Sequence, residues 1–442
     1  MLHPGLSPEQ RTFFEAAVAE ISLKRLRDVN RTITGIHSPT GRERELAEWL
    51  VSYMQGIGLD ASYQPMTELS GNAIGRKRGN DARGTSLLLY APIDTHMEGD
   101  ASDLPWCGPV LRPDMQPTPI EQDGMIIGLG ASNPKAMATT IAEAVRAVLA
   151  VKAPLAGDLL LGYAGGGMPL DVTAAGRRGL SDGVAHLLSR GVHADFGLVM
   201  KPGNAVSYEE PGLCWFKVVC EGTLGYAGMR HDLPNFRSSI VPMAKVILEL
   251  EEWLTKYTVK NTSGLVAPQG WIAAVQGGSG GRAAFPSATT ELFLDIRCNP
   301  RTPPAEVKAQ FAEAIDDIQR RLGVELSWEM VAALPGARTD PENWIIQSAR
   351  RAWEEVEGKP HPPPRVSSGQ TDISMIRNLG IPTARTGWVA NPEATPAEYL
   401  QGLGGMGVAR PEDFVPVCRK LVYSIIDTCM RLRSDTGAVK TA

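Results

Sequence analysis

The stretch SLLLYAPIDTHMEGD, residues 86–100, joins a run of apolar residues and a tyrosine directly to a loop rich in acidic side chains. A short apolar run bounded by polar residues is typical of a strand buried within a sheet. The loop after it carries Asp94, His96, Glu98 and Asp100. Three interpretations are open for these side chains: a metal site, a catalytic acid that needs no metal, and a solvated polar loop.

Two further apolar runs, DLLLGYAG and ADFGLVMKP, follow, and the alanine-rich helical pattern AMATTIAEAVRAVLAV lies between the first run and the second. Short buried strands that alternate with helices predict an α/β layer with a largely parallel sheet. A helix is expected before the first strand, because SPTGRERELAEWLVSYMQGIG places Leu46 and Leu50 at helical spacing and ends in glycines. In such sheets the loops at the carboxyl ends of the strands form the binding site, and Asp94, Tyr163 and Lys201 fall there.

The middle of the chain has a different order of elements. From residue 212 the patterns read strand, helix, strand, strand, helix, strand, which predicts a small two-layer, ferredoxin-like domain. The α/β alternation resumes afterwards, so we expect this domain to be an insertion. The predicted boundaries are therefore 1–211 and 332–442 for the two parts of the α/β domain, and 212–331 for the inserted domain.

Composition narrows the classes of protein to be considered. A chain of 442 residues has room for two or more domains, and a net charge of −5 does not favour binding to nucleic acid or to an anionic membrane. No apolar run is long enough to span a bilayer, and the first residues lack the pattern of a signal peptide, so a cytoplasmic location is expected. The six cysteines are scattered, which predicts reduced and mostly buried thiols.

Four motifs carry a resemblance to a known family: SPTGRERELAEWLVSYMQGIGLD, GLGASNPKA, GTLGYAG and SSGQTDISMIRNLGIPTARTG. In order and spacing they resemble the M20 family of metallopeptidases and amidohydrolases. The resemblance implies a zinc-exopeptidase-like fold, which is a mixed, largely parallel sheet flanked by helices. It also implies that the inserted domain serves as a lid and dimerisation domain, and that relatives hold two zinc ions with five ligands.

The metal positions of that family are replaced in this sequence. The family's zinc ligands and catalytic glutamate align with Pro92, Asn133, Gly165, Gly166 and Lys201. Between residues 404 and 413, where the resemblance places a last histidine ligand, there is no histidine. A lysine at a ligand position repels a dication through its own charge. We therefore expect no metal ligands and no cofactor.

The candidate catalytic residues are Asp94, Lys201, His96 and Asn133. Asp94 and His96 would form an acid/base pair, because residues two apart in an extended segment point the same way and a carboxylate orients an imidazole. Lys201 and Asn133 would polarise a carbonyl in place of zinc. The structural alternative is a solvated loop in which Asp94 caps a turn.

A second set of residues is expected to bind substrate. Ser132 and Lys135 are spaced as S-x-x-K, as in hydrolases with a serine nucleophile, although this spacing also arises by chance. Arg282 can hold a substrate carboxylate through two hydrogen bonds, or it is a surface charge. The full set comprises Lys135, Ser132, Tyr163, Tyr226, His231, Arg282, Gln370 and Thr371.

The first functional hypothesis is a metal-independent hydrolase that cleaves an amide or related C–N bond in a small, carboxylated molecule. The alternatives are a catalytically inactive M20-like protein that binds a small molecule or peptide, and a metallohydrolase with displaced ligands. The displaced ligands would come from His96, Asp94, Glu98 or Asp100. The expected partners are a small-molecule substrate and a second copy of the chain, bound through the apolar helix SSIVPMAKVILELEEWL of the inserted domain.

Overall fold

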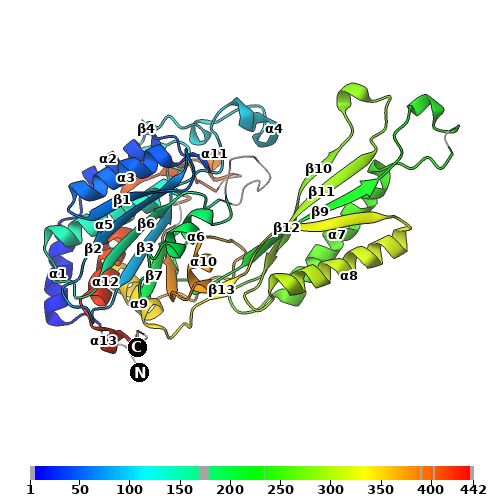
Figure 1. The fold of residues 1–442 in the computed structure, drawn as a ribbon. Coiled ribbons are helices and arrows are strands. Elements are labelled where there is room, and N and C mark those ends of the chain that lie inside the picture. The colour runs from blue at the N-terminus through cyan, green and yellow to red at the C-terminus, as the bar shows by residue number, and fades with distance from the viewer. Residues whose placement is uncertain (1–4, 169–178, 233, 389–390, 402–403, 439–442) are drawn as a thin grey trace. The chain divides into compact units, whose positions relative to one another are not determined.

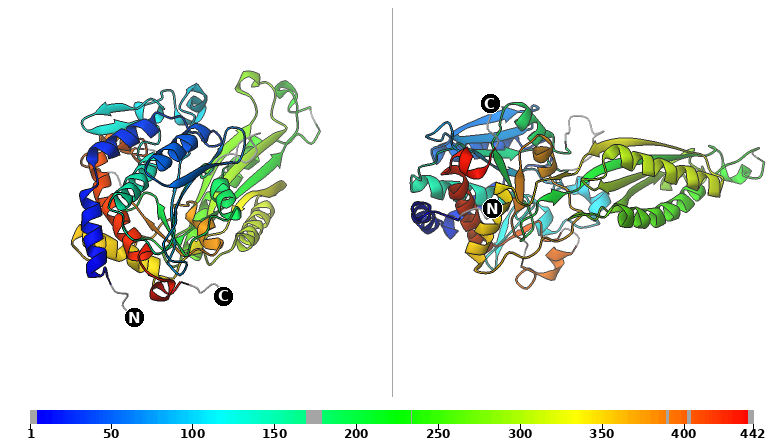
Figure 2. Two further views of the ribbon diagram at one scale, coloured as in Figure 1. Left: turned by 60° about the vertical axis from the view of Figure 1, so that its left-hand side comes forward. Right: turned by 90° about the horizontal axis from the view of Figure 1, so that it is seen from below.

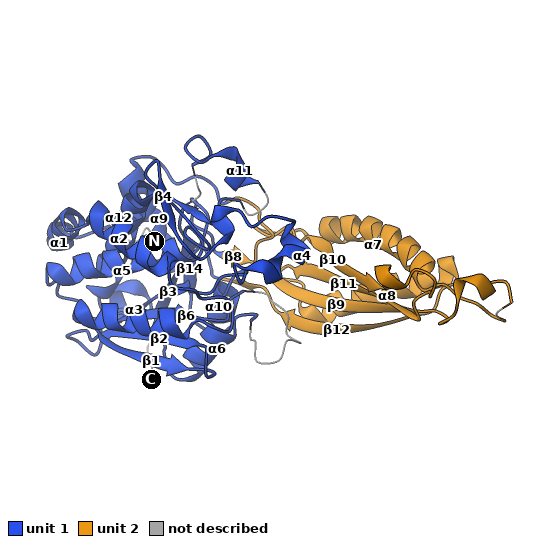
Figure 3. Cartoon of the chain, turned by 90° about the horizontal axis from the view of Figure 1, so that it is seen from above, with its two compact units in different colours: residues 1–208, 339–364, 371–442 blue, residues 209–338, 365–370 orange. Residues whose placement is uncertain are grey.

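The chain forms two compact units in the computed structural model (Figure 3). The structure describes residues 5–168, 179–232, 234–388, 391–401 and 404–438. Unit 1 comprises Met1–Tyr208, Thr339–Pro364 and Thr371–Ala442. Unit 2 comprises Glu209–Arg338 and Arg365–Gln370. The divisions lie outside the expected 212–331 at both ends, because strands β8 (Glu209–Glu210) and β13 (Ala337–Arg338) pair with each other.

Unit 1 is built on a six-stranded sheet in the order β1-β2-β6-β3-β7-β14 (Figure 1). Strands β6, β3, β7 and β14 run parallel, and β1 and β2 are antiparallel additions at one edge. The predicted mixed, largely parallel sheet is therefore confirmed. The strands are β1 (Asp60–Pro65), β2 (Gly71–Lys77), β3 (Leu87–Pro92), β6 (Leu159–Ala164), β7 (Phe196–Met200) and β14 (Thr383–Thr386).

Side-chain alternation along the parallel strands supplies two cores, one on each face of the sheet. Leu87 and Leu89 belong to one buried cluster, whereas Leu88 and Tyr90 belong to another. The first face is covered by helices α1 (Pro8–Ala19), α2 (Leu23–Thr34), α3 (Arg44–Gly56), α5 (Lys135–Ala150), α9 (Trp344–Glu357) and α12 (Phe414–Cys429). The second is covered by α6 (Asp182–Ser189) and α10 (Ile373–Asn378), and the views in Figures 1 and 2 show the resulting three layers.

Short elements complete unit 1. A three-stranded sheet has the order β15-β5-β4. The remaining short elements are α4 (Leu104–Cys107), β4 (Ile120–Gln122), β5 (Met125–Ile127), α11 (Ala397–Leu400), β15 (Val408–Ala409) and α13 (Arg433–Thr436). No helix among the described residues is both long enough and apolar enough to cross a membrane. All six cysteines are free and five of them are buried, as expected from their spacing.

Unit 2 has the expected order of elements, β-α-β-β-α-β. It contains β9 (Gly212–Glu221), α7 (Ile240–Asn261), β10 (Gly270–Gly277), β11 (Thr289–Cys298), α8 (Pro304–Leu322) and β12 (Leu326–Leu334). The four strands form an antiparallel sheet in the order β10-β11-β9-β12. Its core joins the sheet to both helices, and Phe216 of β9 stacks on Phe311 of α8 with ring centroids 4.2 Å apart.

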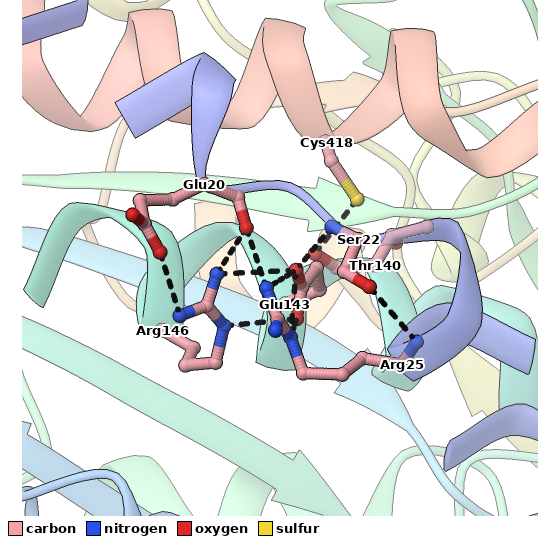
Figure 4. Close-up of polar contacts among 7 residues, drawn as sticks. All are labelled: Glu20, Ser22, Arg25, Thr140, Glu143, Arg146 and Cys418. Atoms are coloured by element: carbon pink, nitrogen blue, oxygen red, sulfur yellow. Dashed lines mark hydrogen bonds and ion pairs between the residues drawn. The ribbon is translucent and has the colours of Figure 1, made fainter. Parts of the chain in front are cut away.

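A buried charge network ties the start of α2 to α5 in unit 1 (Figure 4). The carboxylate of Glu143, whose side chain is 2% exposed, accepts hydrogen bonds from the backbone N–H of Ser22 at 2.8 Å and from Arg25 Nη2 at 3.1 Å. Arg146 Nε donates to the same carboxylate at 3.1 Å, and Arg146 also donates to the backbone carbonyl of Glu20. One acidic side chain thus satisfies donors from three residues, which belong to the start of α2 and to α5.

Replacing Glu143 by alanine is expected to lower the free energy of unfolding by about 2–3 kcal/mol, because it removes the carboxylate that pairs with Arg25 and Arg146 and accepts from the Ser22 N–H. Chemical denaturation measures this change. The control is Glu20→Ala, which removes an exposed carboxylate 3.5 Å from Arg146 and should change stability by less than about 0.5 kcal/mol. Equal effects of the two substitutions would show that the buried network is not the source of the stability.

Candidate active site

The candidate site lies at the carboxyl edge of the parallel strands of unit 1. Strands β3, β6 and β7 run in the same direction, so the segments that follow them meet at one edge of the sheet. Asp94 follows β3, the glycine loop 165–167 follows β6, and Lys201 follows β7. Asp372, directly before α10, completes this set from the last third of the chain.

Asp94 is fully buried and held by two donors. Its Oδ2 accepts hydrogen bonds from Thr40 Oγ1 at 2.8 Å and from the backbone N–H of Met168 at 2.9 Å. Its Oδ1 is buried and has no hydrogen-bond partner among the described residues. Burial raises the pKa of the Asp94 carboxyl, and the hydrogen bonds together with the charge of Lys201 act in the opposite direction. Asp94 is therefore a carboxyl with an oxygen available for another donor.

Asp372 is the second buried carboxyl of the site. It accepts hydrogen bonds from Tyr90 Oη at 2.6 Å and from Ser181 Oγ at 2.7 Å. Burial raises the pKa of Asp372 to about 6, against the lowering effect of the Lys201 charge. The same environment raises the pKa of Tyr90 well above its ordinary value, so Tyr90 is a hydrogen-bond donor.

Lys201 supplies the positive charge of the site. Its side chain is 6% exposed, and its ammonium is close enough to Asp94 and Asp372 to lower the pKa of both carboxyls. A buried ammonium between carboxyls balances their charge in the way that a bound cation does. The arrangement can keep a carboxylate ionised in a buried place and present a cation to a substrate oxygen.

A third carboxyl, Glu43, was not predicted from the sequence. Its Oε1 accepts hydrogen bonds from the backbone N–H groups of Gly41 at 2.7 Å and Gly166 at 2.9 Å, while its Oε2 is buried without a partner among the described residues. Burial, followed by the charge of Asp94, raises the pKa of Glu43 to about 7. A signal was present, because Glu43 falls on the same helical stripe as the buried Leu46 and Leu50.

The glycine loop after β6 provides the space for these carboxyls. A Cβ on Gly165 would lie 2.8 Å from Glu43 Oε2, and a Cβ on Gly167 would lie 2.6 Å from Asp372 Oδ2 and 3.2 Å from Asp94 Oδ1. Any larger side chain at Gly167 would therefore displace a carboxylate. Glycines here leave a gap that two carboxylate oxygens border.

The expected Asp94–His96 pair is wrong. His96 Nε2 is buried without a hydrogen-bond partner among the described residues, and the ring lies edge-on to Trp106 with centroids 6.4 Å apart. Burial lowers the pKa of His96. The two side chains were expected to point the same way because residues two apart do so in an extended segment. The segment is not extended here, because the chain bends at His96, directly after Thr95 forms a β-bridge to Pro39.

The contacts of Lys135 do not support the alternative in which Ser132 and Lys135 act as a nucleophile and its base. Lys135 Nζ donates to the backbone carbonyls of Ile36 at 2.7 Å and Thr34 at 3.3 Å, so it satisfies the end of α2 instead of activating a serine. Burial lowers the pKa of Lys135 to about 7. The N–H groups of Ser132 and Asn133 both donate to the carbonyl of Met406, and a role of Ser132 in substrate binding stays a prediction.

Tyr163 and Asn133 have different outcomes. Tyr163 was expected to bind substrate at the end of β6, but its ring is fully buried in the core under α5 and its hydroxyl donates to the carbonyl of Ala138 at 3.4 Å. A tyrosine whose hydroxyl points into the helix layer cannot contact substrate. Asn133 Oδ1 is buried without a partner among the described residues, and its part in the site stays a prediction.

The other predicted substrate residues stay predictions. Tyr226, His231 and Arg282 are exposed residues of unit 2, and the loops of Tyr226 and Arg282 are joined by the Ala227 N–H to Ala284 carbonyl bond at 2.8 Å. Gln370 belongs to unit 2, and Thr371 belongs to unit 1. The Thr371 hydroxyl accepts from the N–H of Ile373 at 3.4 Å, in the turn that begins α10.

The donor set does not fit a pair of zinc ions. Within the described ranges no three His, Cys, Asp or Glu side chains are grouped as metal ligands, which also contradicts the displaced set of His96, Asp94, Glu98 and Asp100. The buried carboxyls are bonded instead to hydroxyl and backbone donors, and they share an ammonium. Zinc sites in proteins use several His, Cys or carboxylate ligands with no competing fixed cation.

Comparisons with known proteins place this architecture among amide-bond hydrolases. The chain is 24% identical over 375 residues to N-formyl-4-amino-5-aminomethyl-2-methylpyrimidine deformylase of Bacillus subtilis (strain 168), which covers 78% of this chain and 82% of that protein. The structure of the present chain is similar to that of human carnosine dipeptidase 1, with a TM-score of 0.69 and 14% identity. The match covers 97% of this chain and 100% of that one.

A second solved structure with the same fold is that of a hydantoinase/carbamoylase family amidase from Burkholderia ambifaria, with a TM-score of 0.57 and 15% identity. The match covers 94% of this chain and 98% of that chain. At these identities the structural likeness establishes the fold. The family model described as Peptidase family M20/M25/M40 matches residues 88–406, which is more than half of the chain. This chain therefore belongs to peptidase family M20/M25/M40.

Proposed function

We propose that this protein hydrolyses an amide or related C–N bond in a small, carboxylated molecule without a metal ion. The observation that carries the proposal is the buried Lys201 ammonium, whose charge acts on both Asp94 and Asp372. Membership of a family whose relatives named above include a deformylase, a dipeptidase and an amidase supports the reaction class.

The chemistry uses groups of unit 1 alone. Asp94 takes a proton from a water molecule, and the water oxygen bonds to the substrate carbonyl carbon. Lys201 and Asn133 stabilise the negative charge that develops on the carbonyl oxygen. The C–N bond then breaks, and the proton held by Asp94 passes to the leaving nitrogen. Water is consumed, and an acid and an amine are released.

The gap at Gly167 supports this assignment. Gly167 is partly exposed, and the position of its missing Cβ is bordered by oxygens of Asp94 and Asp372. The attacking water would donate to Asp94 Oδ1, the oxygen that has no hydrogen-bond donor among the described residues. A substrate carboxylate would be held by the same Lys201 charge.

The proposal is tested by screening the purified protein against amides, N-formyl amines, ureas and cyclic imides, with and without a chelator. We expect at least one of these classes to be hydrolysed at a rate that the chelator does not change. Loss of turnover with chelator, restored by zinc, would contradict the metal-independent reaction. Saturable binding without turnover of any class would favour a binding protein.

Elemental analysis gives an independent prediction. The purified protein is expected to carry far less than one zinc, manganese or cobalt ion per chain, because the Lys201 charge acts on the same carboxyls and no group of three ligands lies among the described residues. Inductively coupled plasma spectrometry on protein purified without chelator measures this content. One or more ions per chain, lost on Asp94→Ala, would place a metal at this site after all.

A further inference from the structure

Glu43 and Asp94 are bound by the same two loops. The loop before α3 supplies one donor to each carboxylate, from the consecutive residues Thr40 and Gly41. The loop 165–168 after β6 likewise supplies one backbone N–H to each. Because both pairs of donors are close together in the chain, the two carboxyl groups are neighbours. Glu43 and its donor Gly166 are 123 residues apart in the sequence, and Asp94 and its donor Met168 are 74 residues apart.

Each of these carboxyls has one occupied and one unoccupied oxygen. Glu43 Oε2 and Asp94 Oδ1 are buried and have no hydrogen-bond partner in the described parts of the chain, and both residues are 0% exposed. Two ionised carboxylates in such a place repel each other, and each has one buried oxygen without a hydrogen-bond partner among the described residues. One proton on the pair removes a charge and turns an acceptor into a donor.

We propose that Glu43 and Asp94 hold one proton between them, and that Glu43 is a positioning residue that sets the charge of Asp94. This inference rests on the proposed function, since it assigns the second carboxyl of the same site. In the resting protein Glu43 carries the proton and Asp94 is ionised. Asp94 then receives the proton of the attacking water and passes it to the leaving nitrogen, while the proton on Glu43 is retained through the cycle.

The charged and titratable groups around the pair favour this state. The groups facing it from the surrounding elements are Tyr63 of β1, Tyr90 of β3, Lys201 after β7 and Asp372 before α10. Lys201 is the cation of this set, and its charge favours ionisation of Asp94. Burial and the charge of Asp94 raise the pKa of Glu43 to about 7, against the lowering effect of the Ser70 hydroxyl and of the N–H groups of Gly41 and Gly166, so Glu43 keeps its proton in slightly acidic solution.

The first test is the pH profile of kcat/KM for the wild type and for Glu43→Gln. Glutamine keeps an oxygen for the N–H groups of Gly41 and Gly166 but carries no charge, so a purely structural role predicts an unchanged profile. A shared proton predicts a bell-shaped wild-type profile with an alkaline limb near pH 7, and loss of that limb in Glu43→Gln. Glu45→Gln, an exposed glutamate in the first turn of α3, is the matched control and should match the wild type.

The second test needs no substrate. Side-chain carboxyl groups labelled with carbon-13 are titrated by NMR in the intact protein, and one glutamate is expected to titrate near pH 7, to disappear in Glu43→Gln and to shift to lower pH in Asp94→Asn. Titration of Glu43 near its ordinary pKa would overturn the shared proton even if amides are hydrolysed. A near-neutral Glu43 in a protein that hydrolyses no amide would uphold the pair and overturn the proposed function alone.

Discussion

Replacing Lys201 by methionine is expected to lower kcat/KM by at least about 100-fold, because it removes the cation that stabilises the developing oxyanion. Its charge also lowers the pKa of Asp94 and Asp372, so without it both carboxyls hold their protons to higher pH. A protonated Asp94 cannot accept a proton from water. Steady-state kinetics on the substrate found in the screen measure the loss, and full activity in Lys201→Met would make Asp94 a structural residue.

Stability provides a second measurement on the same variant. A carboxyl whose pKa is raised in the folded state loses its contribution to stability as the pH rises through that pKa. Removing Lys201 raises the pKa of the buried carboxyls further, so the stability deficit should be small at pH 5 and reach about 3 kcal/mol at pH 8. Lys420→Met, which removes another buried ammonium bonded to Glu357 at 2.6 Å, should lower stability without changing kcat/KM.

A variant that combines the Lys201 and Asp94 substitutions tests whether the two residues act in the same step of the reaction. Lys201→Met and Asp94→Asn should each nearly abolish turnover, and the double variant should be no slower than the slower single variant. Non-additivity is expected because both groups act in the same step and because the Lys201 charge also keeps Asp94 ionised. Additive losses would mean that Lys201 and Asp94 serve separate steps.

Gly183→Ala is expected to have the largest effect on folding. A Cβ at Gly183 would lie 1.8 Å from the backbone carbonyl oxygen of Gly165 and 2.9 Å from Asn72 Oδ1. Asn72 joins the two segments, since it accepts from the N–H of Gly165 and donates to the carbonyl of Gly183. The backbone must move, so we expect a loss of about 3 kcal/mol in stability and, by displacement of the glycine loop, about 100-fold in kcat/KM.

Gly56→Ala is the matched control for that experiment. Gly56 is the exposed last residue of α3, and nothing lies within 4 Å of the position of its Cβ. Alanine there should raise stability by up to about 1 kcal/mol, because it restricts the unfolded chain and favours the helix. Thermal unfolding measures the stability of both variants, and it compares Gly183, where a close contact leaves no space for a side chain, with Gly56, where the space is open. A wild-type stability in Gly183→Ala would contradict the close approach of the two segments.

Much of the fold could be predicted from local patterns. The run Leu87–Pro92 is apolar on both faces because helices cover both sides of the sheet, and that pattern alone indicates a central parallel strand. The order of elements in unit 2 followed from periodicity in the same way. The small pair of β8 and β13 was not predicted, because two residues carry no detectable alternation.

The site was harder to predict because its members come from distant segments. Asp94 and Lys201 could be placed, since each follows a predicted parallel strand. Glu43 was missed because an acidic residue at the start of a helix ordinarily faces solvent, so its place on the stripe of Leu46 and Leu50 was not used, and its tertiary partner Gly166 cannot be found from spacing. Lys135 and His96 were assigned to chemistry because sequence spacing does not reveal the carbonyls or the bend that fix them.

The hydrogen bonds of Asp372 determine when the site can exist during synthesis of the chain. Asp372 bonds to Tyr90 and Ser181, which precede it by 282 and 191 residues, and most of unit 2 is made in between. Contacts of such long separation form late, after local elements have closed the intervening loop. A nascent chain can therefore complete the sheet of unit 2 on its own before the ribosome has delivered the residue that closes the carboxyl cluster. Full-length synthesis and formation of the site are thus coupled events.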